Sequence, residues 1–169
     1  MSKIKCPKCG EEQDTFIGDY RYIESGLDNV IICGIEIFQC SCGEHSAFIP
    51  KIMELHKLIA KCLIEQTWPL GGKEIRFLRK NMAMRATELA RFLGVDKATV
   101  SRWENDKDKH SDIVDRYMRL LYATRMNMPK EANILATDLL SAIDATHPKL
   151  PIFLMADQLG HFTCFHECR

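Results

Sequence analysis

The sequence lacks the long apolar segment that a membrane span requires. Its apolar runs stay far below the roughly 18 consecutive residues that cross a bilayer. The first residues contain no apolar stretch followed by a small-residue cleavage site, so we expect no signal peptide. We find no internal repeat and no low-complexity stretch. These absences predict a globular protein that remains in the cytoplasm.

The chain also has no formal net charge, because 23 Lys and Arg residues balance 23 Asp and Glu residues. A neutral total argues against nonspecific binding of polyanions. The charges are nevertheless segregated: residues 1–50 carry a net charge of −4, whereas residues 73–109 contain ten basic and six acidic side chains, a net of +4. We therefore expect any nucleic-acid surface to lie within residues 73–109.

Patterns typical of enzymes are absent as well. We find no pair of carboxylates placed for acid–base chemistry, no glycine-rich phosphate loop and no nucleophile with an adjacent base. Glu44, His45 and His56 are interpreted as surface or helix-packing residues. We therefore do not expect an enzyme.

Residues 1–49 predict short strands between turns, because β-branched and aromatic residues dominate three runs. The runs are 15–17, 20–23 and 30–38, the last interrupted by Gly34. This region contains too little apolar material for an independent core. A helix is expected to begin at Pro50 and to run to Gln66. Its apolar residues at helical spacing are Ile52, Leu55, Ile59 and Leu63.

Residues 67–72 break the helical pattern and are predicted to link two domains. Short helices are predicted from Lys73 to about residue 125, and a last helix from Lys130 to Ala145. The final apolar runs are compatible with a β-hairpin that turns at Leu159 and Gly160. The predicted class is α+β: a β-rich domain over residues 1–66, an all-α domain over residues 73–128 and a C-terminal part over residues 129–169.

Eight cysteines in a chain expected to be cytoplasmic favour metal or redox chemistry over disulfides, because thiols are kept reduced there. Cys6 and Cys9 form one pair, and Cys40 and Cys42 form a second pair further along the chain. Four thiolates complete the tetrahedral shell of a structural Zn²⁺ and leave no open position for catalysis. Since zinc affinity in such sites is also folding free energy, the ion is expected to replace the missing core.

The second cysteine pair is unusual, because one residue separates its cysteines where two are customary. Cys33 or His45 is therefore an alternative ligand, although a cysteine that fills an apolar strand position is the more ordinary interpretation of Cys33. The tail contains His161, Cys164, His166 and Cys168. Their spacing matches no standard metal site, which favours a frayed terminus with idle thiols over a second ion.

Residues 73–105 carry the most specific pattern of the chain. Two short helices are predicted from two groups of apolar residues: Ile75, Leu78 and Met82, then Leu89, Ala90 and Leu93. Gly94 permits the tight turn that follows, since glycine tolerates positive φ. Asp96 is placed to cap a third helix, which Val100 and Trp103 anchor. This spacing is typical of a helix-turn-helix, whose second helix enters the major groove of DNA.

Anchoring through Val100 and Trp103 turns the opposite face of the third helix outward. The residues of that face are Lys97, Ala98, Thr99, Ser101 and Arg102. Arg102 is the expected base reader, because arginine donates two parallel hydrogen bonds to guanine; threonine and alanine methyls can contact a thymine methyl. Asn105, Lys107 and Lys109 are predicted to bind phosphates, which fix register without reading sequence. The alternative interpretation is a solvated charged face on a small helical core.

Residues 93–105 resemble the Xre/Cro group of helix-turn-helix domains. Residues 6–42, followed by Glu44 and residues 49–56, resemble the YgiT-type zinc finger. The two in this order resemble the MqsA antitoxin family and its regulator relatives, over roughly residues 1–125. The resemblance implies a zinc-organised N-terminal domain that can neutralise a ribonuclease toxin, and a second domain that dimerises and binds palindromic operator DNA.

The chain departs from the family pattern at the DNA-binding helices. Where the family places serine and glutamine before the second helix, this chain has Arg85 and Ala86. A cap and a phosphate contact are thereby lost, although Arg85 can supply another phosphate contact. The family's base-reading asparagine is matched by Ala98 and its arginine by Arg102, so we expect a different operator sequence.

Two functions follow from these observations. The first is a transcriptional regulator, a repressor that binds double-stranded operator DNA as a homodimer. The second is a type II antitoxin whose acidic N-terminal domain binds a basic ribonuclease, with DNA binding as autoregulation. The regulator is favoured, because residues 130–169 are not part of the antitoxin pattern.

Three predicted helices carry apolar faces suited to a two-fold interface, and the sequence does not choose among them. They are residues 50–66, residues 111–125 and the last helix. On residues 111–125 the apolar face comprises Ile113, Val114, Tyr117, Leu120 and Leu121.

Overall fold

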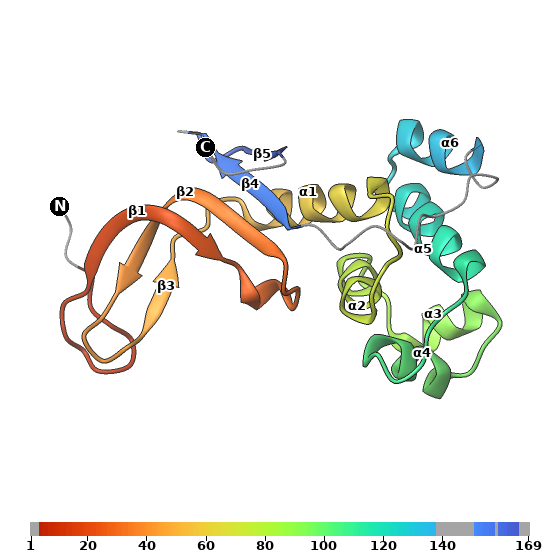
Figure 1. The fold of residues 1–169 in the computed structure, drawn as a ribbon, viewed down its shortest axis with the longest axis horizontal. Coiled ribbons are helices and arrows are strands. Elements are labelled where there is room, and N and C mark those ends of the chain that lie inside the picture. The colour runs from red at the N-terminus through yellow and green to blue at the C-terminus, as the bar shows by residue number, and fades with distance from the viewer. Residues whose placement is uncertain (1–3, 138–150, 158, 166–169) are drawn as a thin grey trace. The chain divides into compact units, whose positions relative to one another are not determined.

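The computed structural model describes residues 4–137, 151–157 and 159–165. The chain divides into two compact units: residues 1–23, 28–58 and 151–169 form the first, and residues 24–27 and 59–150 form the second. The predicted α+β class is confirmed, because the first unit holds the strands and the second holds α2 to α6 (Figure 1). No helix in the described part of the chain is both long and apolar enough to cross a membrane.

The first unit is built on a sheet with the strand order β1-β2-β4-β5, in which β3 also pairs with β2 (Figure 1). The strands are β1 (Asp14–Arg21), β2 (Val30–Gln39), β3 (His45–Ala47), β4 (Ile152–Ala156) and β5 (Phe162–Phe165). β2 runs antiparallel to β1 and β3 but parallel to β4, with Val30 opposite Ile152. The hairpin at the end of the chain is confirmed, because β4 and β5 pair antiparallel.

The runs predicted as strands before residue 39 form two long strands. β1 continues past Gly18, with a bulge between Gly18 and Tyr20. β2 continues through Gly34, whose φ of 69° lies in the left-handed region that favours glycine. Glycine therefore marks an irregularity within each strand and not a chain reversal. The buried side chains of this unit include Val30, Ile32, Ile35, Ile37, Leu55 and Leu154.

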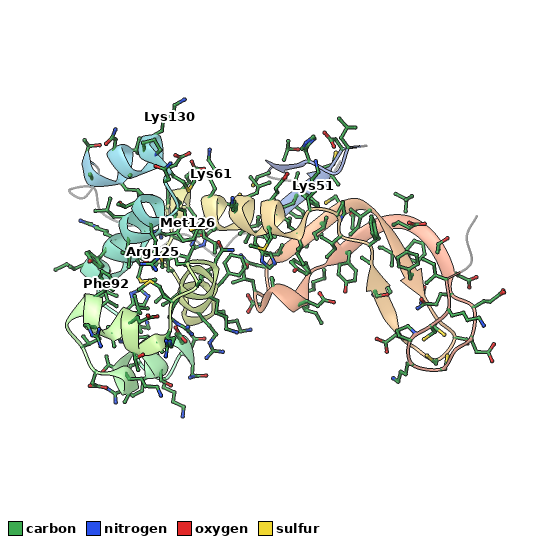
Figure 2. All side chains as sticks on the ribbon, turned by 180° about the vertical axis from the view of Figure 1, so that it is seen from behind. Lys51, Lys61, Phe92, Arg125, Met126 and Lys130 are labelled. Atoms are coloured by element: carbon green, nitrogen blue, oxygen red, sulfur yellow. The ribbon has the colours of Figure 1, made fainter. Side chains whose placement is uncertain are left out.

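The second unit is helical. Its helices are α2 (Gly72–Asn81), α3 (Ala86–Leu93), α4 (Lys97–Glu104), α5 (Asp112–Arg125) and α6 (Pro129–Thr137). α1 (Ile52–Glu65) begins two residues after Pro50 and contributes residues 59–65 to this unit. Lys61 of α1, which Figure 2 labels, forms an ion pair with Glu131 of α6 at 2.9 Å. The part of the predicted last helix beyond Thr137 lies outside the described residues.

α5 buries a face other than the apolar stripe that its sequence pattern indicates. The buried residues are Asp115, Met118, Arg119, Tyr122 and Ala123. Ile113 and Tyr117, by contrast, are 77% and 38% exposed. The inward face combines buried apolar packing with hydrogen bonds: Asp115 accepts from Arg119 Nε and from the Leu70 N–H, each at 2.5 Å.

Arg119 fastens the segment between α1 and α2. Its guanidinium donates to the backbone carbonyls of Leu63, Ile64, Gln66 and Trp68. Most of these carbonyls belong to the last turn of α1 or to the residues directly after it, where a helix leaves carbonyls without partners. The segment with the composition of a linker is thus tied to α5 by buried polar groups.

Candidate nucleic-acid interface and metal centre

α3 and α4 are joined by a short turn whose geometry follows from Gly94 and Asp96. Gly94 ends α3 in the left-handed conformation, with φ 67° and ψ 29°. Asp96 caps α4, because its side chain accepts the Thr99 N–H at 2.8 Å. That backbone N–H also lowers the pKa of Asp96, so the cap stays ionised. Both roles agree with the sequence prediction.

α4 buries Val100 (0% exposed) and Trp103 (8%) against the rest of the unit. Residues spaced around the other side of the helix therefore face outward. Lys97, Ala98, Ser101 and Arg102 are exposed and Thr99 is half-buried. The structure brings all five predicted base-facing residues onto one exposed helix surface, which we call the α4 face.

A buried ion pair fixes α4 to α2. Glu104, at the end of α4, is 5% exposed and accepts hydrogen bonds from Arg79 of α2, at 2.5 Å from Nε and 2.8 Å from Nη2. Arg76 adds a third contact at 3.4 Å, and Arg79 also donates to the Met84 carbonyl. Paired carboxylate and guanidinium groups of this kind match each other in geometry as well as charge. The orientation of the α4 face is therefore set by more than apolar packing.

The acidic residues of the basic segment are engaged in hydrogen bonds within the domain, although Asp96, Asp106 and Asp108 stay exposed. All six of them accept hydrogen bonds from backbone N–H groups or arginines: Glu74, Glu88, Asp96, Glu104, Asp106 and Asp108. Many of the basic side chains are exposed: Lys73, Lys80, Arg85, Arg91, Lys97, Lys107 and Lys109. Basic residues thus outnumber acidic ones among the exposed side chains of this segment, which favours binding of a polyanion.

Arg102 belongs to a chain of hydrogen bonds along the α4 face. Its Nε donates to Asp108 at 2.6 Å, and its Nη2 donates to the Thr99 hydroxyl at 3.0 Å. The Thr99 hydroxyl in turn donates to Asp96 at 3.0 Å. Because the Thr99 hydroxyl accepts one hydrogen bond and donates another, its methyl group is the part of the side chain left for apolar contact.

The predicted phosphate-binding residues lie around the ends of these helices. Lys107 and Lys109 are exposed in the segment after α4. Asn105 is also exposed, but its amide donates to the Ser101 carbonyl at 2.6 Å and accepts from Arg76 at 2.8 Å, so it helps to close α4. Arg85 stands at the N-cap of α3, where Glu88 accepts its backbone N–H at 2.6 Å. That bond replaces one part of the lost cap and leaves the Arg85 side chain exposed.

Cys6, Cys9, Cys40 and Cys42 come together at one end of the sheet. Their Sγ atoms all lie within 4.8 Å of one another. Cys6 and Cys42 are 3.7 Å apart, and Cys9 and Cys40 are 3.4 Å apart. Four sulfurs at about 2.3 Å from one Zn²⁺ would be about 3.8 Å from each other, so the cluster has nearly the size of a tetrahedral thiolate shell.

The one-residue spacing of Cys40 and Cys42 does not prevent the cluster from forming. The Gly43 N–H donates to the Cys40 carbonyl at 2.9 Å, which curls the chain so that both sulfurs face the first pair. Cys33 and His45, the alternative ligands, lie outside the cluster. Cys33 is buried within β2 and is disulfide-bonded, so the expectation of metal or redox chemistry in place of disulfides is wrong for this cysteine. The His45 ring lies 5.6 Å from that of Tyr20. In the tail, Cys164 lies in β5 opposite Leu154, and the His161 ring is hydrogen-bonded to Asp157 at 3.1 Å, so the frayed terminus predicted for these two residues is wrong. His166 and Cys168 lie outside the described residues.

Backbone N–H groups point at the sulfurs and change their acidity. The pKa of Cys40 is lowered to about 7, chiefly by the N–H of Cys42. The N–H of Glu11 lowers the pKa of Cys9. The neighbouring thiols and burial outweigh that effect and raise the pKa of Cys9 to about 12. Crowded thiols of this kind lose their protons together only when a cation balances the charge.

Sequence reasoning missed the polar contacts that hold the two helices of the site. Arg79 and Glu104 are separated by 25 positions, and nothing local distinguishes them from other surface charges. Asp108 was part of a run of alternating charges after α4, with no sign that it would reach Arg102. The i,i+4 spacing of Asp115 and Arg119 is visible in the sequence, but such pairs are ordinarily exposed.

Residues 75–114 match the family model described as Helix-turn-helix (HTH_3). The matched range begins in α2, contains α3 and α4, and ends in the first turn of α5. Neither the curated proteins nor the solved structures include a match to the chain. The helix-turn-helix predicted from the sequence is therefore confirmed, and it indicates a DNA-binding regulator.

Proposed function

We propose that this chain is a transcriptional repressor that binds palindromic operator DNA as a homodimer through the α4 face. The observation that carries the proposal is the outward placement of five polar or small residues on α4, over a helix anchored by Val100 and Trp103. A helix held in this way can enter the major groove, where base pairs are distinguishable by their hydrogen-bonding groups.

Each residue of the α4 face has a role in the proposal. Arg102 binds guanine O6 and N7, and the Ala98 and Thr99 methyls contact a thymine methyl. Lys97 and Ser101 donate hydrogen bonds to base edges or to the backbone beside them. Around this surface, Arg85, Asn105, Lys107 and Lys109 contact phosphates and so set the register.

Selection of bound DNA from a random duplex pool tests this function. The wild type should enrich a palindrome whose half-sites lie about 34 Å apart, one turn of DNA. Arg102→Ala should relax one base per half-site and weaken specific binding by about 1–3 kcal/mol. Lys107→Ala is the matched control, because loss of a phosphate contact lowers affinity for all sequences and preserves the consensus. Failure of folded, metal-loaded protein to enrich any sequence would exclude the operator-binding function.

We place the dimer interface on α5, among the three helices with apolar faces. Ile113, Val114, Tyr117, Leu120 and Leu121 repeat at helical spacing on a side that the domain leaves at least partly exposed. Ile113 is 77% exposed, which is unusual for a large apolar residue in such a stripe. Covering this stripe with the same stripe of a second copy satisfies the self-complementarity of a two-fold interface.

Ile113→Glu should convert the dimer to the 19.4 kDa monomer in sedimentation velocity and weaken operator binding. Ile113 is too exposed for the substitution to disturb the fold, so circular dichroism should be unchanged. Ile134→Glu is the matched control, since Ile134 is 57% exposed on α6 and this helix is outside the proposed interface. Monomer formation by Ile134→Glu alone would move the interface to α6.

For the four-cysteine cluster we propose a structural Zn²⁺. The sulfur separations fit a tetrahedral shell, and four protein thiolates leave no position for a reacting water. The ion would neutralise thiolates that are otherwise costly to hold side by side. This role makes no demand on the α4 face and fits a protein without enzymatic activity.

Antitoxin activity is a second candidate, supported by the surface of the first unit. Exposed apolar side chains stand there among the acidic residues of residues 1–50: Phe16 is 45%, Ile17 70% and Phe48 62% exposed. Such a surface suits a basic protein partner such as a ribonuclease. The discriminating observation is a neighbouring gene whose expression arrests growth unless this chain is co-expressed. Without such a gene, the protein acts as a stand-alone regulator.

A further inference from the structure

The hydrogen bonds of Arg102 leave a defined set of donors for DNA. A guanidinium has five N–H groups. One on Nε binds Asp108 and one on Nη2 binds Thr99. Three remain, two on Nη1 and one on Nη2. A pair of parallel N–H groups at the end of the side chain is what guanine O6 and N7 require.

Asp108 is held beside Arg102 by the main chain. After α4 ends at Glu104, the chain folds back: the N–H of Asp106 donates to the Trp103 carbonyl, and the N–H of Lys107 donates to the Arg102 carbonyl at 2.9 Å. The side chain of Asp106 fixes the same turn by accepting the Gly72 N–H. The carboxylate of Asp108 therefore contacts Arg102 at the end of a turn that main-chain and side-chain hydrogen bonds hold in place.

A carboxylate in this place lowers general affinity for DNA. The Asp108 side chain is 51% exposed and that of Arg102 is 47% exposed, so both reach the solvent side of the α4 face. A negative charge there repels phosphates whatever the base sequence. It also prevents Arg102 from turning to a nearby phosphate, which every sequence offers equally. A group that weakens all complexes but favours one geometry raises selectivity.

We propose that Asp108 is a specificity-determining positioning residue, which holds Arg102 for reading one base at the cost of general affinity for DNA. Asp108 acts through Arg102 and does not itself contact the base. The inference rests on the proposed function, in which Arg102 reads DNA. Thr99 and Asp96 orient Arg102 from its other side: Arg102 Nη2 donates to the Thr99 hydroxyl, which in turn donates to Asp96.

Binding of Asp108→Ala to the selected operator, to its single-base variants and to an unrelated duplex tests the proposal. Affinity for the unrelated duplex should rise about threefold, because a charge that repels phosphates is gone. The preference for the correct base at the Arg102 position should fall about tenfold, the scale of one oriented bidentate contact. Preferences at other positions should stay as in the wild type.

Two further variants separate positioning from simple charge removal. Asp112→Ala removes the same charge from an exposed residue in the first turn of α5, and it should leave every base preference unchanged. In the Arg102→Ala background, Asp108→Ala should change no base preference further, because the group on which it acts is missing. Additive losses in the double variant would overturn the proposal.

The failures of the inference and of the function can be told apart. If the wild type selects an operator that depends on Arg102, and Asp108→Ala keeps the wild-type preference, the function stands and Asp108 has no positioning role. Asp108 also has no positioning role if Asp108→Ala binds the operator more tightly with an unchanged base profile, since the carboxylate would then only compete with DNA. A wild type without any preference overturns the function and the inference together.

Discussion

Replacing Gly72 by alanine should destabilise the second unit by about 3 kcal/mol, at the upper end of the cost of overpacking. A Cβ at this position would lie 2.1 Å from the carbonyl oxygen of Trp103 and 2.7 Å from Oδ1 of Asp106. The first is a backbone atom that cannot rotate away, and the second already accepts the Gly72 N–H at 2.9 Å. The start of α2 and the end of α4 must therefore move apart, and the α4 face loses part of its support.

Tryptophan fluorescence during urea unfolding measures this effect. The chain has two tryptophans, Trp68 and Trp103, and both lie in the second unit, so the signal reports on that unit. Gly71→Ala is the matched control, because the nearest atom to its Cβ would be Oε2 of Glu74 at an ordinary 3.6 Å. Its φ of −82° suits alanine, and we expect no loss or a gain of about 0.4–1 kcal/mol. Equal midpoints for Gly72→Ala and the wild type would contradict the close approach.

Cys9→Ser should abolish zinc binding and with it the order of the loop that carries Cys6 and Cys9. Among residues 4–13, only Cys6 and Gln13 are buried, so little apolar packing holds this loop in place. Structural zinc contributes about 10 kcal/mol or more to small domains of this kind, and the loss of one thiolate removes much of that. The effect should exceed that of any single apolar substitution in the first unit.

Metal content and limited proteolysis measure the consequence. The wild type should carry one zinc ion per chain, and trypsin should cleave after Lys8, between the two cysteines, only once a chelator is present. In Cys9→Ser, cleavage at Lys8 should need no chelator. Cys164→Ser, at an exposed position in β5, should keep both the zinc and the protection. Wild-type protein without zinc, or Cys9→Ser protein that retains zinc and protection, would rule out the proposed site.

The helix-turn-helix was predictable because its determinants are local. Val100 and Trp103 are buried, as their spacing predicts, and Gly94 has the positive φ that the turn requires. Asp96 caps the next helix as expected. The amphipathic pattern of a short helix predicts which side is buried. Once Val100 and Trp103 are assigned to that side, the exposed residues of α4 can be predicted as well. The family match over residues 75–114 covers this part of the chain.

α5 shows where such local reasoning stops. Its apolar stripe predicts a face suited to a two-fold interface, but the pattern does not reveal that the face buried by the fold includes the charged residues Asp115 and Arg119. Buried charges are acceptable here because each has several partners: Arg119 caps the carbonyls at the end of α1, and Asp115 accepts the Leu70 N–H. Those partners come from segments about 50 positions away, and no periodicity within α5 can reveal them.

By itself, then, the sequence determined the features whose partners are near neighbours along the chain or are chemically unmistakable. These are the α4 face, its cap and turn, the terminal hairpin and the four cysteines that share one chemistry. Only the tertiary structure decided that β4 runs parallel to β2, that Gly72 is a contact point between helices and that Asp108 holds Arg102. Each of these depends on backbone and polar groups that folding brings together, and such contacts leave no trace in local periodicity because many placements of the same residues satisfy it equally well.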